Sequence, residues 1–438
     1  MAKYPAGKRK KVGTPKIVSR SKAEKDPSSY VLRMLLNASP YYVSGSVLAQ
    51  KLKMSRVGIW SRIDKLRKAG LTIEASQNLG YRLAGEPNQL NLPLLNAWMK
   101  ENRKVCDVFI HNEVDSTNSE VERLLANDTK TPFAVLSNEQ KRGRGRLGRS
   151  WHSPKGGNIY LSLGFRPNIQ AIRLRNFTLW QGLNICRFLR HFMGTEKIMI
   201  KWPNDIYFDG KKLAGMLTEA SIDCESIRTL IFGIGINVNI PTQHYPKNLA
   251  KHSNSLQNIN AEQIRIHELA AKLIKIILLS YKDCVSKNLE EELVNGWSEV
   301  DELSGKKIKV KCGNENFQGK AAGIDIDGNL LLKLRNGRMK KVQKLGIFQG
   351  QEFGSFIQFE TKELISKPEL LVSEIFKNDL DLVYCSVVPQ VENVFKKAIS
   401  SFRKEIFAIS PNFCGGIPIS YSNKEEIGAD RIANSIAA

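Results

Sequence analysis

Apolar and polar positions change their spacing several times along the chain. Residues 28–86 show helical spacing followed by a short alternating stretch, residues 87–300 mix helical and strand-like stretches, and residues 301–350 alternate strongly. Helical spacing indicates amphipathic helices, and strict alternation indicates half-buried strands. The pattern therefore predicts an α+β multidomain chain.

Both ends of the chain differ from this folded middle. Residues 1–27 are rich in lysine and show little periodicity, which predicts a disordered basic arm that touches DNA phosphates or only solubilises the chain. Residues 355–438 begin a further α/β segment. Because the sequence ends within a predicted helix, we expect this segment to be partial.

The pattern of residues 28–86 is typical of a winged helix-turn-helix. Ser46 is expected to cap a short helix, and Ser55 a longer one whose buried stripe is Ile59, Ile63 and Leu66. The stretch LTIEASQNLGYRL then alternates around a turn, as the wing of such a domain does.

The longer helix carries basic and polar side chains at its beginning, where a recognition helix reaches bases and phosphates. We therefore expect Ser55, Arg56 and Trp60 to bind DNA. The alternative is a basic helical domain that docks on a protein.

The strand-like stretches of residues 87–300 are short and apolar and follow no regular βαβ rhythm. They read VLSNEQ, NIYLSLGF, IMIKWPNDIYF, KLAGMLTEA and TLIFGIGINVNI, and they predict a mixed sheet with helices on one side. Residues 301–350 have turns at Gly313, Gly328 and Gly337 and are expected to form a small β-barrel.

The charge balance points to anionic partners. The formal net charge is +23, which favours nucleic acid, nucleotides or an acidic carrier protein. No uninterrupted apolar run is long enough for a membrane span, and the basic N-terminus lacks the apolar core of a secretory signal. We expect a cytoplasmic protein without a membrane partner.

Cysteine usage agrees with this interpretation. The cysteines stand singly, with no CxxC pair and no histidine at ligand spacing, at positions 106, 186, 224, 284, 312, 385 and 414. This pattern predicts a reducing compartment and no metal site.

The stretch EQKRGRGRLGRSWHSP alternates arginine with glycine. Arg144, Arg146 and Arg149 supply forked donors for phosphate and carboxylate, and the intervening glycines allow close approach of the backbone. We expect a mobile flap that folds over a phosphate. A disordered RNA-binding tract is the alternative, and one short copy between strands disfavours it.

Two further polar clusters accompany the flap. In KWPND, Lys201 follows the apolar strand IMI, and a lysine among apolar neighbours needs an anion as its partner; the alternative is a surface lysine before a turn. In DSTN, residues 115–118 precede a predicted helix, and taken alone they are best explained as a helix cap.

Together these motifs resemble those of biotin protein ligases. The order over residues 28–350 is that of the family: winged helix, STN, GRGR-x-GR-x-W, KWPND, KLAG, GIGIN and a small Src-homology-like barrel. The N-terminal winged helix makes the chain similar to the bifunctional class, which also represses the biotin operon.

The resemblance implies roles by position. The residues that would bind biotin are Ser116, Thr117, Asn118, Gln140, Arg144, Gly145, Arg146 and Lys201. The nucleotide contacts would be Arg146, Arg149 and Trp151, the catalytic cations Lys201, Arg144 and Arg146, and the floor Lys212, Gly215, Gly233 and Gly235. Arg142 departs from the small residue that often precedes GRGR, with little expected effect.

The implied reaction agrees with these residue types. Biotin carboxylate attacks the α-phosphate of ATP, and fixed cations, with Mg²⁺, stabilise the charge that develops. Biotinyl-AMP is then kept from water until a lysine of the biotin carboxyl carrier domain of acetyl-CoA carboxylase arrives. The resemblance also implies operator DNA as a partner and a homodimer when biotinyl-AMP is bound.

The C-terminal segment resembles type III pantothenate kinases through SVVP and YSNKEEIGADR. The resemblance implies a pantothenate site at Tyr421, Gly428, Ala429, Asp430 and Arg431. The DxGN phosphate loop of that family is not visible in residues 351–360, and its later strand would lie beyond Ala438, so we expect no kinase activity.

Two other functions stay open. One is a DNA-binding regulator that only senses biotin, which the intact GRGR and KWPND motifs disfavour. The other is a fused ligase and pantothenate kinase of coenzyme A biosynthesis, which the missing phosphate-binding parts disfavour.

Overall fold

A computed structural model describes residues 27–99, 106–146, 148–223, 226–312, 315–342, 382–384 and 406–408. Contacts divide the chain into two units, and the second takes in residues 313–315 and 348–438. Within the first unit, apolar side chains form separate clusters for the winged helix, the central sheet and the sheet of residues 307–342.

The winged helix-turn-helix is confirmed by its elements, which are α2 (Pro27–Ala38), α3 (Gly45–Leu52), α4 (Arg56–Lys68), β1 (Thr72–Ser76) and β2 (Gly80–Gly85). The Ser55 hydroxyl caps α4 by accepting from the Gly58 N–H at 3.0 Å. The α3 prediction was wrong in one respect, because Ser44 and not Ser46 is the capping residue. The predicted stripe of Ile59, Ile63 and Leu66 is buried.

A short helix, α5 (Leu92–Trp98), follows the wing and belongs to two apolar clusters. Leu94 and Ala97 are buried in the cluster of the winged helix, whereas Leu95 is buried in that of the central sheet. Trp98 packs against both clusters. The helix therefore joins the two domains through its side chains as well as through the chain.

The segment before α5 is fastened to the central domain by asparagine side chains. The Asn138 amide accepts from the Leu90 N–H at 2.8 Å and donates to the Leu90 carbonyl at 3.2 Å. Asn239, just after the GIGIN motif, donates to Asn88 Oδ1 at 2.9 Å. Both asparagines follow strands that border the candidate site described below.

The central sheet is mixed, as predicted. Its strand order is β3-β4-β5-β10-β9-β8-β7, with β6 paired to β10; β3 and β4 are parallel and the other pairs are antiparallel. The strands are β3 (Asp107–His111), β4 (Phe133–Ser137), β5 (Ile159–Phe165), β6 (Ile169–Gln170), β7 (Ile198–Lys201), β8 (Asp205–Phe208), β9 (Lys211–Asp223) and β10 (Ser226–Ile236).

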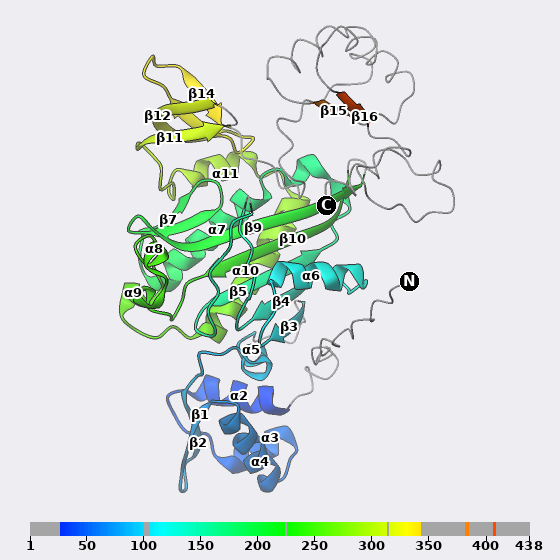
Figure 1. Ribbon diagram of the computed structural model, residues 1–438. Coiled ribbons are helices and arrows are strands. Elements are labelled where there is room, and N and C mark those ends of the chain that lie inside the picture. The colour runs from blue at the N-terminus through cyan, green and yellow to red at the C-terminus, as the bar shows by residue number, and fades with distance from the viewer. Residues whose placement is uncertain are drawn as a thin grey trace, which may run out of the picture. The chain divides into compact units, whose positions relative to one another are not determined.

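Helices cover the two faces of this sheet unequally (Figure 1). The face that carries Ala134 and Leu136 packs against α7 (Phe177–Met193) and α10 (Ile266–Ser286), and it forms the large core. The opposite face packs against α6 (Thr117–Ala126) over β4, β5 and β10. The predicted placement of helices on one side thus holds for α7 and α10 but not for α6.

Shorter helical elements complete this domain, and they are η1 (Ala171–Leu174), η2 (Thr242–His244), α8 (Lys247–Ala250), α9 (Gln257–Asn260) and α11 (Glu290–Trp297). Cys106, Cys186 and Cys284 are buried thiols outside any disulfide, and burial raises the pKa of the Cys186 thiol to about 12. Among the described residues, no helix combines the length and apolar character needed to cross a membrane.

The strands β11 (Lys307–Cys312), β12 (Glu315–Ile324), β13 (Leu330–Lys333) and β14 (Met339–Val342) form a four-stranded sheet in that order. No pairing between β11 and β14 closes it among the described residues, so the predicted barrel stays a prediction. The sheet contacts the KWPND turn, because the Trp202 indole donates to the Gly328 carbonyl at 3.0 Å.

In the second unit, the parallel strands β15 (Leu382–Tyr384) and β16 (Ile406–Ala408) are described. Tyr421, Gly428, Ala429, Asp430 and Arg431, predicted to form a pantothenate-like site, lie outside the described residues.

Candidate functional site

Three glycines leave part of one sheet face without side chains. Gly215 of β9 lies directly opposite Gly235 of β10, and Gly233 lies two residues from Gly235 on the same face. A Cβ atom on Gly233 would collide with the Asn118 amide, and one on Gly235 with the Trp151 indole. We call these three residues the glycine floor, and only a residue without a side chain fits at each position.

The strand register places further predicted residues on the same face. Asp205 lies opposite Gly215 and also opposite Lys201, so Gly235, Gly215, Asp205 and Lys201 form one row across four strands. Directly opposed residues point to the same side of an antiparallel sheet. The register therefore brings the KLAG, GIGIN and KWPND motifs together, although they are separated in the sequence.

One end of the floor is lined by neutral polar side chains. Gln140 Oε1 accepts from the Thr117 N–H at 2.8 Å, and Gln140 Nε2 donates to Ser153 Oγ at 2.8 Å. The Ser162 hydroxyl lies 2.6 Å from Asn118 Oδ1. These groups converge from α6, β5 and the loop after β4, so the predicted Thr117, Asn118 and Gln140 do lie together.

Ser116 is buried at the N-cap position of α6, but its side chain makes no capping hydrogen bond. Its N–H donates instead to Asp115 Oδ1 at 2.8 Å. Asp115 is held in turn by Arg123, whose guanidinium hydrogen bonds lower the pKa of Asp115 to about 2. The helix start is thus fixed by this ion pair, which leaves the Ser116 hydroxyl out of the cap.

The other end of the floor is aromatic and charged. Trp151 lies over Gly215 and Gly235, and its buried Nε1 has no hydrogen-bond partner among the described residues. Lys212 Nζ lies 5.3 Å from the centroid of the Trp151 ring and 2.8 Å from Asp205 Oδ1. An aromatic plane beside a cation suits a nucleotide, whose base can stack and whose phosphate is anionic.

Two arginines of the arginine-glycine loop (residues 139–154) bind side chains beside the glycine floor. Arg144 Nη2 donates to Glu219 Oε2 at 2.6 Å, and Arg146 Nη1 donates to Asn204 Oδ1 at 3.1 Å. Burial lowers the pKa of Arg146, against the opposing effect of Asp205, yet an arginine stays protonated in proteins. The third arginine of the motif, Arg149, is exposed.

Lys201 does not occupy the buried setting that its apolar neighbours suggested. It is half-buried, its Nζ lies 4.8 Å from the centroid of the Tyr207 ring, and no carboxylate lies within ion-pair distance of it among the described residues. Its amine is therefore available to an anion of a ligand.

Sequence reasoning missed Glu219 and Ser162 and gave Lys212 only a place in the floor. Alternation along β9 puts Glu219 on the face of Gly215. Alternation along β5 puts Ser162 on the face of Tyr160, which is the face of the glycine floor because these residues lie opposite Gly233 and Gly235. That spacing was the available signal, but it indicates a shared face and not a contact.

In the winged helix, Arg56 and Trp60 are exposed at the beginning of α4, and Trp60 is 58% exposed. Arg56 donates to Ser46 Oγ. The Ser55 hydroxyl accepts from the Gly58 N–H as the helix cap, and its own O–H remains a donor that a phosphate oxygen could accept from.

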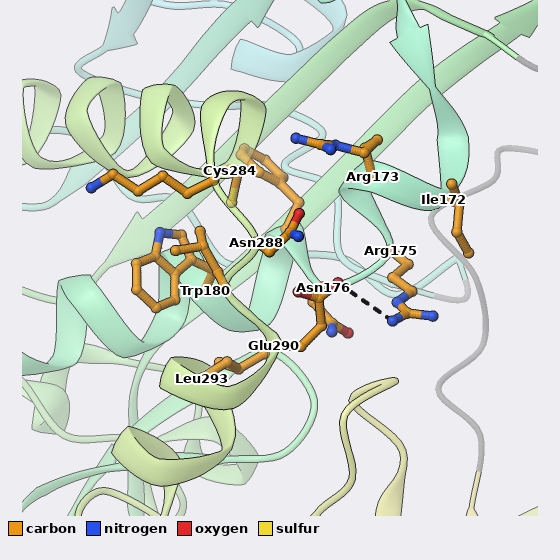
Figure 2. Close-up of a pocket in the computed structure, with 12 residues that line it drawn as sticks. Ile172, Arg173, Arg175, Asn176, Trp180, Cys284, Asn288, Glu290 and Leu293 are labelled. Carbon is orange, nitrogen blue, oxygen red and sulfur yellow. Dashed lines mark hydrogen bonds and ion pairs between the residues drawn. The ribbon is translucent and has the colours of Figure 1, made fainter.

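No group of three or more His, Cys, Asp or Glu side chains suitable for a metal ion occurs among the described residues. A cavity of about 100 Å³ lies apart from the floor, between η1, the start of α7, the end of α10 and the start of α11 (Figure 2). Its Arg175 pairs with Glu290 at 3.4 Å and with Asp327 at 2.6 Å, and it contains none of the predicted site residues.

Family models match successive parts of the chain. The matches are an HTH domain at residues 28–82, the Biotin/lipoate A/B protein ligase family at 111–239, the Biotin protein ligase C terminal domain at 303–346 and Type III pantothenate kinase at 341–438.

Individual proteins show the same division. The Bifunctional ligase/repressor BirA of Bacillus subtilis (strain 168) is 31% identical over 338 residues, which cover 76% of this chain and 100% of that protein. The solved biotin protein ligase from Aquifex aeolicus in complex with biotin and ATP is 28% identical, with a TM-score of 0.46 and coverage of 54% of this chain and 95% of that one. The Type III pantothenate kinase of Methylacidiphilum infernorum (isolate V4) is 35% identical over 96 residues, which cover 22% of this chain and 34% of that kinase.

The glycine floor generates a first prediction. Replacing Gly233 with alanine should lower the free energy of unfolding by about 1–3 kcal/mol, because the added methyl group displaces Asn118. Gly45→Ala is the matched control, since its methyl group would meet only Tyr81 at 3.4 Å. Chemical denaturation measures both variants, and equal stabilities would refute the close packing of Asn118 on the floor.

Proposed function

Because the chain belongs to the family of bifunctional biotin ligases and repressors, we propose that the glycine floor and the loop above it join biotin to AMP and pass it to a protein lysine. The chain is a biotin protein ligase that carries a helix-turn-helix domain before its ligase domain. The acceptor we propose is the biotin carboxyl carrier domain of acetyl-CoA carboxylase.

One observation supports the site most strongly. A continuous bare stretch of sheet has neutral hydrogen-bonding groups at one end and Trp151 with cations at the other. Biotin has a neutral ureido head and an anionic carboxylate, and ATP brings an aromatic base and phosphates. The two substrates laid end to end along this floor would place the carboxylate next to the α-phosphate.

We assign the biotin head to Ser116, Thr117, Asn118 and Gln140, with Gly145 supplying backbone contact beside Arg144. Thr117 and Gln140 are already joined by a hydrogen bond, and a polar network of fixed geometry favours a ligand that matches it. At the opposite end, Trp151 would stack near the adenine, and Arg146 and Arg149 would contact phosphate.

The first chemical step is an in-line displacement. A biotin carboxylate oxygen forms a bond to the α-phosphorus, the bond to the bridging oxygen breaks, and pyrophosphate leaves with the electron pair. Lys201, Arg144 and Arg146 would stabilise the negative charge on the phosphate oxygens, since pre-placed donors act most strongly where charge develops. We add Lys212 to this set because it lies between Asp205 and Trp151.

In the second step, the carrier lysine attacks the acyl carbon of biotinyl-AMP, and AMP leaves with the electron pair of the broken C–O bond. Until then the mixed anhydride must be protected from water. The arginine-glycine loop lies over the floor at Arg144 and Arg146, which suits it to exclude water from the anhydride.

Mg²⁺ would arrive with ATP as part of the substrate. A magnesium ion commonly uses one or two carboxylates together with substrate phosphates. Asp205 is the carboxylate at the nucleotide end, and it already pairs with Lys212, so the described residues do not form a protein cage for the metal.

The winged helix would bind operator DNA when biotinyl-AMP is bound, and the loaded protein would act as a homodimer. The exposed Arg56 and Trp60 support α4 as the recognition helix. The buried cysteine thiols, which form no disulfide, and the use of ATP support a cytoplasmic location. For the C-terminal segment, which spans about a third of the matching kinase, we propose no phosphoryl transfer of its own.

The proposed activity has a direct test. Incubation with labelled biotin, ATP and the carboxylase carrier domain should yield labelled carrier, and a carrier whose acceptor lysine is replaced by arginine should stay unlabelled. A protein that binds biotin but labels no carrier would be a regulator that only senses biotin.

For Lys201, replacement by alanine should slow biotin-dependent pyrophosphate exchange by about 10²–10³-fold, because a donor to the developing phosphate charge is lost. Lys212→Ala should be impaired to a similar degree. The control is Lys197→Ala, an exposed lysine at the start of the same hairpin. An unchanged exchange rate in Lys201→Ala would remove this residue from the catalytic set.

For the winged helix, Arg56→Ala should weaken operator binding and reduce the slope of log affinity against log salt concentration by about 1, since one phosphate contact disappears. Lys282→Ala removes the same charge from the exposed side of α10 and serves as control. Gel-shift titrations at several salt concentrations, with biotinyl-AMP present, measure both slopes. Identical slopes would argue for a contact other than phosphate.

A further inference from the structure

We propose that Glu219 is a positioning residue of the ligase, which orients Asn118 and anchors Arg144 so that the arginine-glycine loop is held on the glycine floor. This inference rests on the proposed function, in which Asn118 and Arg144 contact biotin. Glu219 itself touches no reacting atom in this scheme and acts through its two neighbours.

The carboxylate of Glu219 connects three separate segments of the chain. Glu219 belongs to β9 and lies opposite Ile231 of β10, on the face of the glycine floor. The residue is 8% exposed. One oxygen, Oε2, accepts from Asn118 Nδ2 at 2.7 Å and from Arg144 Nη2 at 2.6 Å. Asn118 comes from the first turn of α6, and Arg144 comes from the loop.

Glu219 determines which way the Asn118 amide faces. A carboxylate only accepts hydrogen bonds, so the NH₂ group of Asn118 must point toward it. The Asn118 oxygen then faces the Ser162 hydroxyl, 2.6 Å away, which donates to it. A neutral glutamine at position 219 could present either its oxygen or its NH₂ group, and the amide of Asn118 would lose its fixed orientation.

Glu219 also gives Arg144 a partner when no anionic ligand is present. A carboxylate this little exposed requires a countercharge, and the Arg144 guanidinium lies within ion-pair distance of it. Hydrogen bonds between charged groups are stronger than those between neutral groups. The loop is therefore attached by an ion pair at Glu219 and by an Arg146 hydrogen bond to the neutral amide of Asn204.

The two attachments lie at different ends of the floor, so their loss should have different effects. Glu219 lies at the biotin end, four residues after Gly215 in β9 and on the same face of the sheet. Asn204 lies in the KWPND turn at the phosphate end. Removing the Glu219 charge should weaken the hold on biotin and biotinyl-AMP. Of the groups proposed to stabilise the phosphate charge, only Arg144 would lose its anchor, whereas Lys201, Arg146 and Lys212 should stay in place.

The experiment uses the full-length chain and the variants Glu219→Gln and Glu219→Asp. Preformed labelled biotinyl-AMP complex is isolated, and its release is followed in excess unlabelled biotin. Glu219→Gln should release the adenylate about tenfold faster or more, as expected for a lost charged hydrogen bond. Its KM for biotin in pyrophosphate exchange should rise, and its kcat should fall far less than that of Lys201→Ala, because Arg144 is still present and only its anchor is lost.

The conservative and control variants separate positioning from a general structural effect. Glu219→Asp keeps the charge and should recover part of the slow release. Glu299→Gln breaks another glutamate–arginine pair, that with Arg187 at 3.0 Å, on the exposed surface, and should release at the wild-type rate. In the biotin complex, trypsin should cut after Arg144 faster in Glu219→Gln than in the wild type.

A double-variant comparison keeps the proposal testable if Glu219→Gln folds poorly. If Glu219 acts through Arg144, adding Glu219→Gln to Arg144→Met should accelerate release little beyond Arg144→Met alone. The positioning role would be overturned if the two substitutions multiplied each other's effect on the release rate of biotinyl-AMP. It would also be overturned if a folded Glu219→Gln variant released biotinyl-AMP at the wild-type rate. Failure of the wild type to form biotinyl-AMP would instead overturn the proposed function.

Discussion

Gly215, Gly233 and Gly235 leave one face of the central sheet without side chains, and the site is built in the space that this creates. Asn118 and Trp151 occupy positions that any Cβ atom on Gly233 or Gly235 would exclude. The register then adds Asp205 and Lys201 to the same row. The depth of the site and the placement of its polar and charged ends therefore both follow from the strand pairing.

A bare strand surface is costly, since glycine in a strand contributes no packing and loses more backbone entropy than other residues. The opposite face of the same strands offsets this cost. Residues such as Ala214, Met216 and Phe232 alternate with the glycine floor and are buried in the same apolar cluster as α7 and α10. The sheet thus uses one face for stability and leaves the other for chemistry.

Periodicity predicted those elements well that the local spacing of apolar and polar residues is enough to define. The cap at Ser55, the stripe of Ile59, Ile63 and Leu66, and the mixed sheet all follow from local spacing. The cap of α3 was misplaced because Ser44 and Ser46 both precede a helical pattern. The choice depends on Val43, which pairs with Tyr81 and fixes where the chain enters the helix.

The site was predictable in its motifs but not in its internal connections. STN, GRGR and KWPND named Asn118, Arg144 and Lys201, whereas the role of Glu219 emerges only when β9, α6 and the loop meet. A single carboxylate in an apolar strand has no signature of its own. Likewise, no spacing rule reveals that Lys212 reaches Trp151 while Lys201 lies on Tyr207.

The helix α5 has a consequence for how the two activities can be separated. Leu94 and Ala97 complete the interior of the winged helix, and Leu95 completes that of the ligase domain, so no cut on either side of α5 leaves both interiors closed. A ligase fragment beginning after residue 86 would expose Leu94 and Ala97 of α5. A DNA-binding fragment ending at residue 86 would lack these two side chains from its interior. Separating the two domains therefore requires polar replacements on the α5 face that is uncovered, in addition to a cut in the chain.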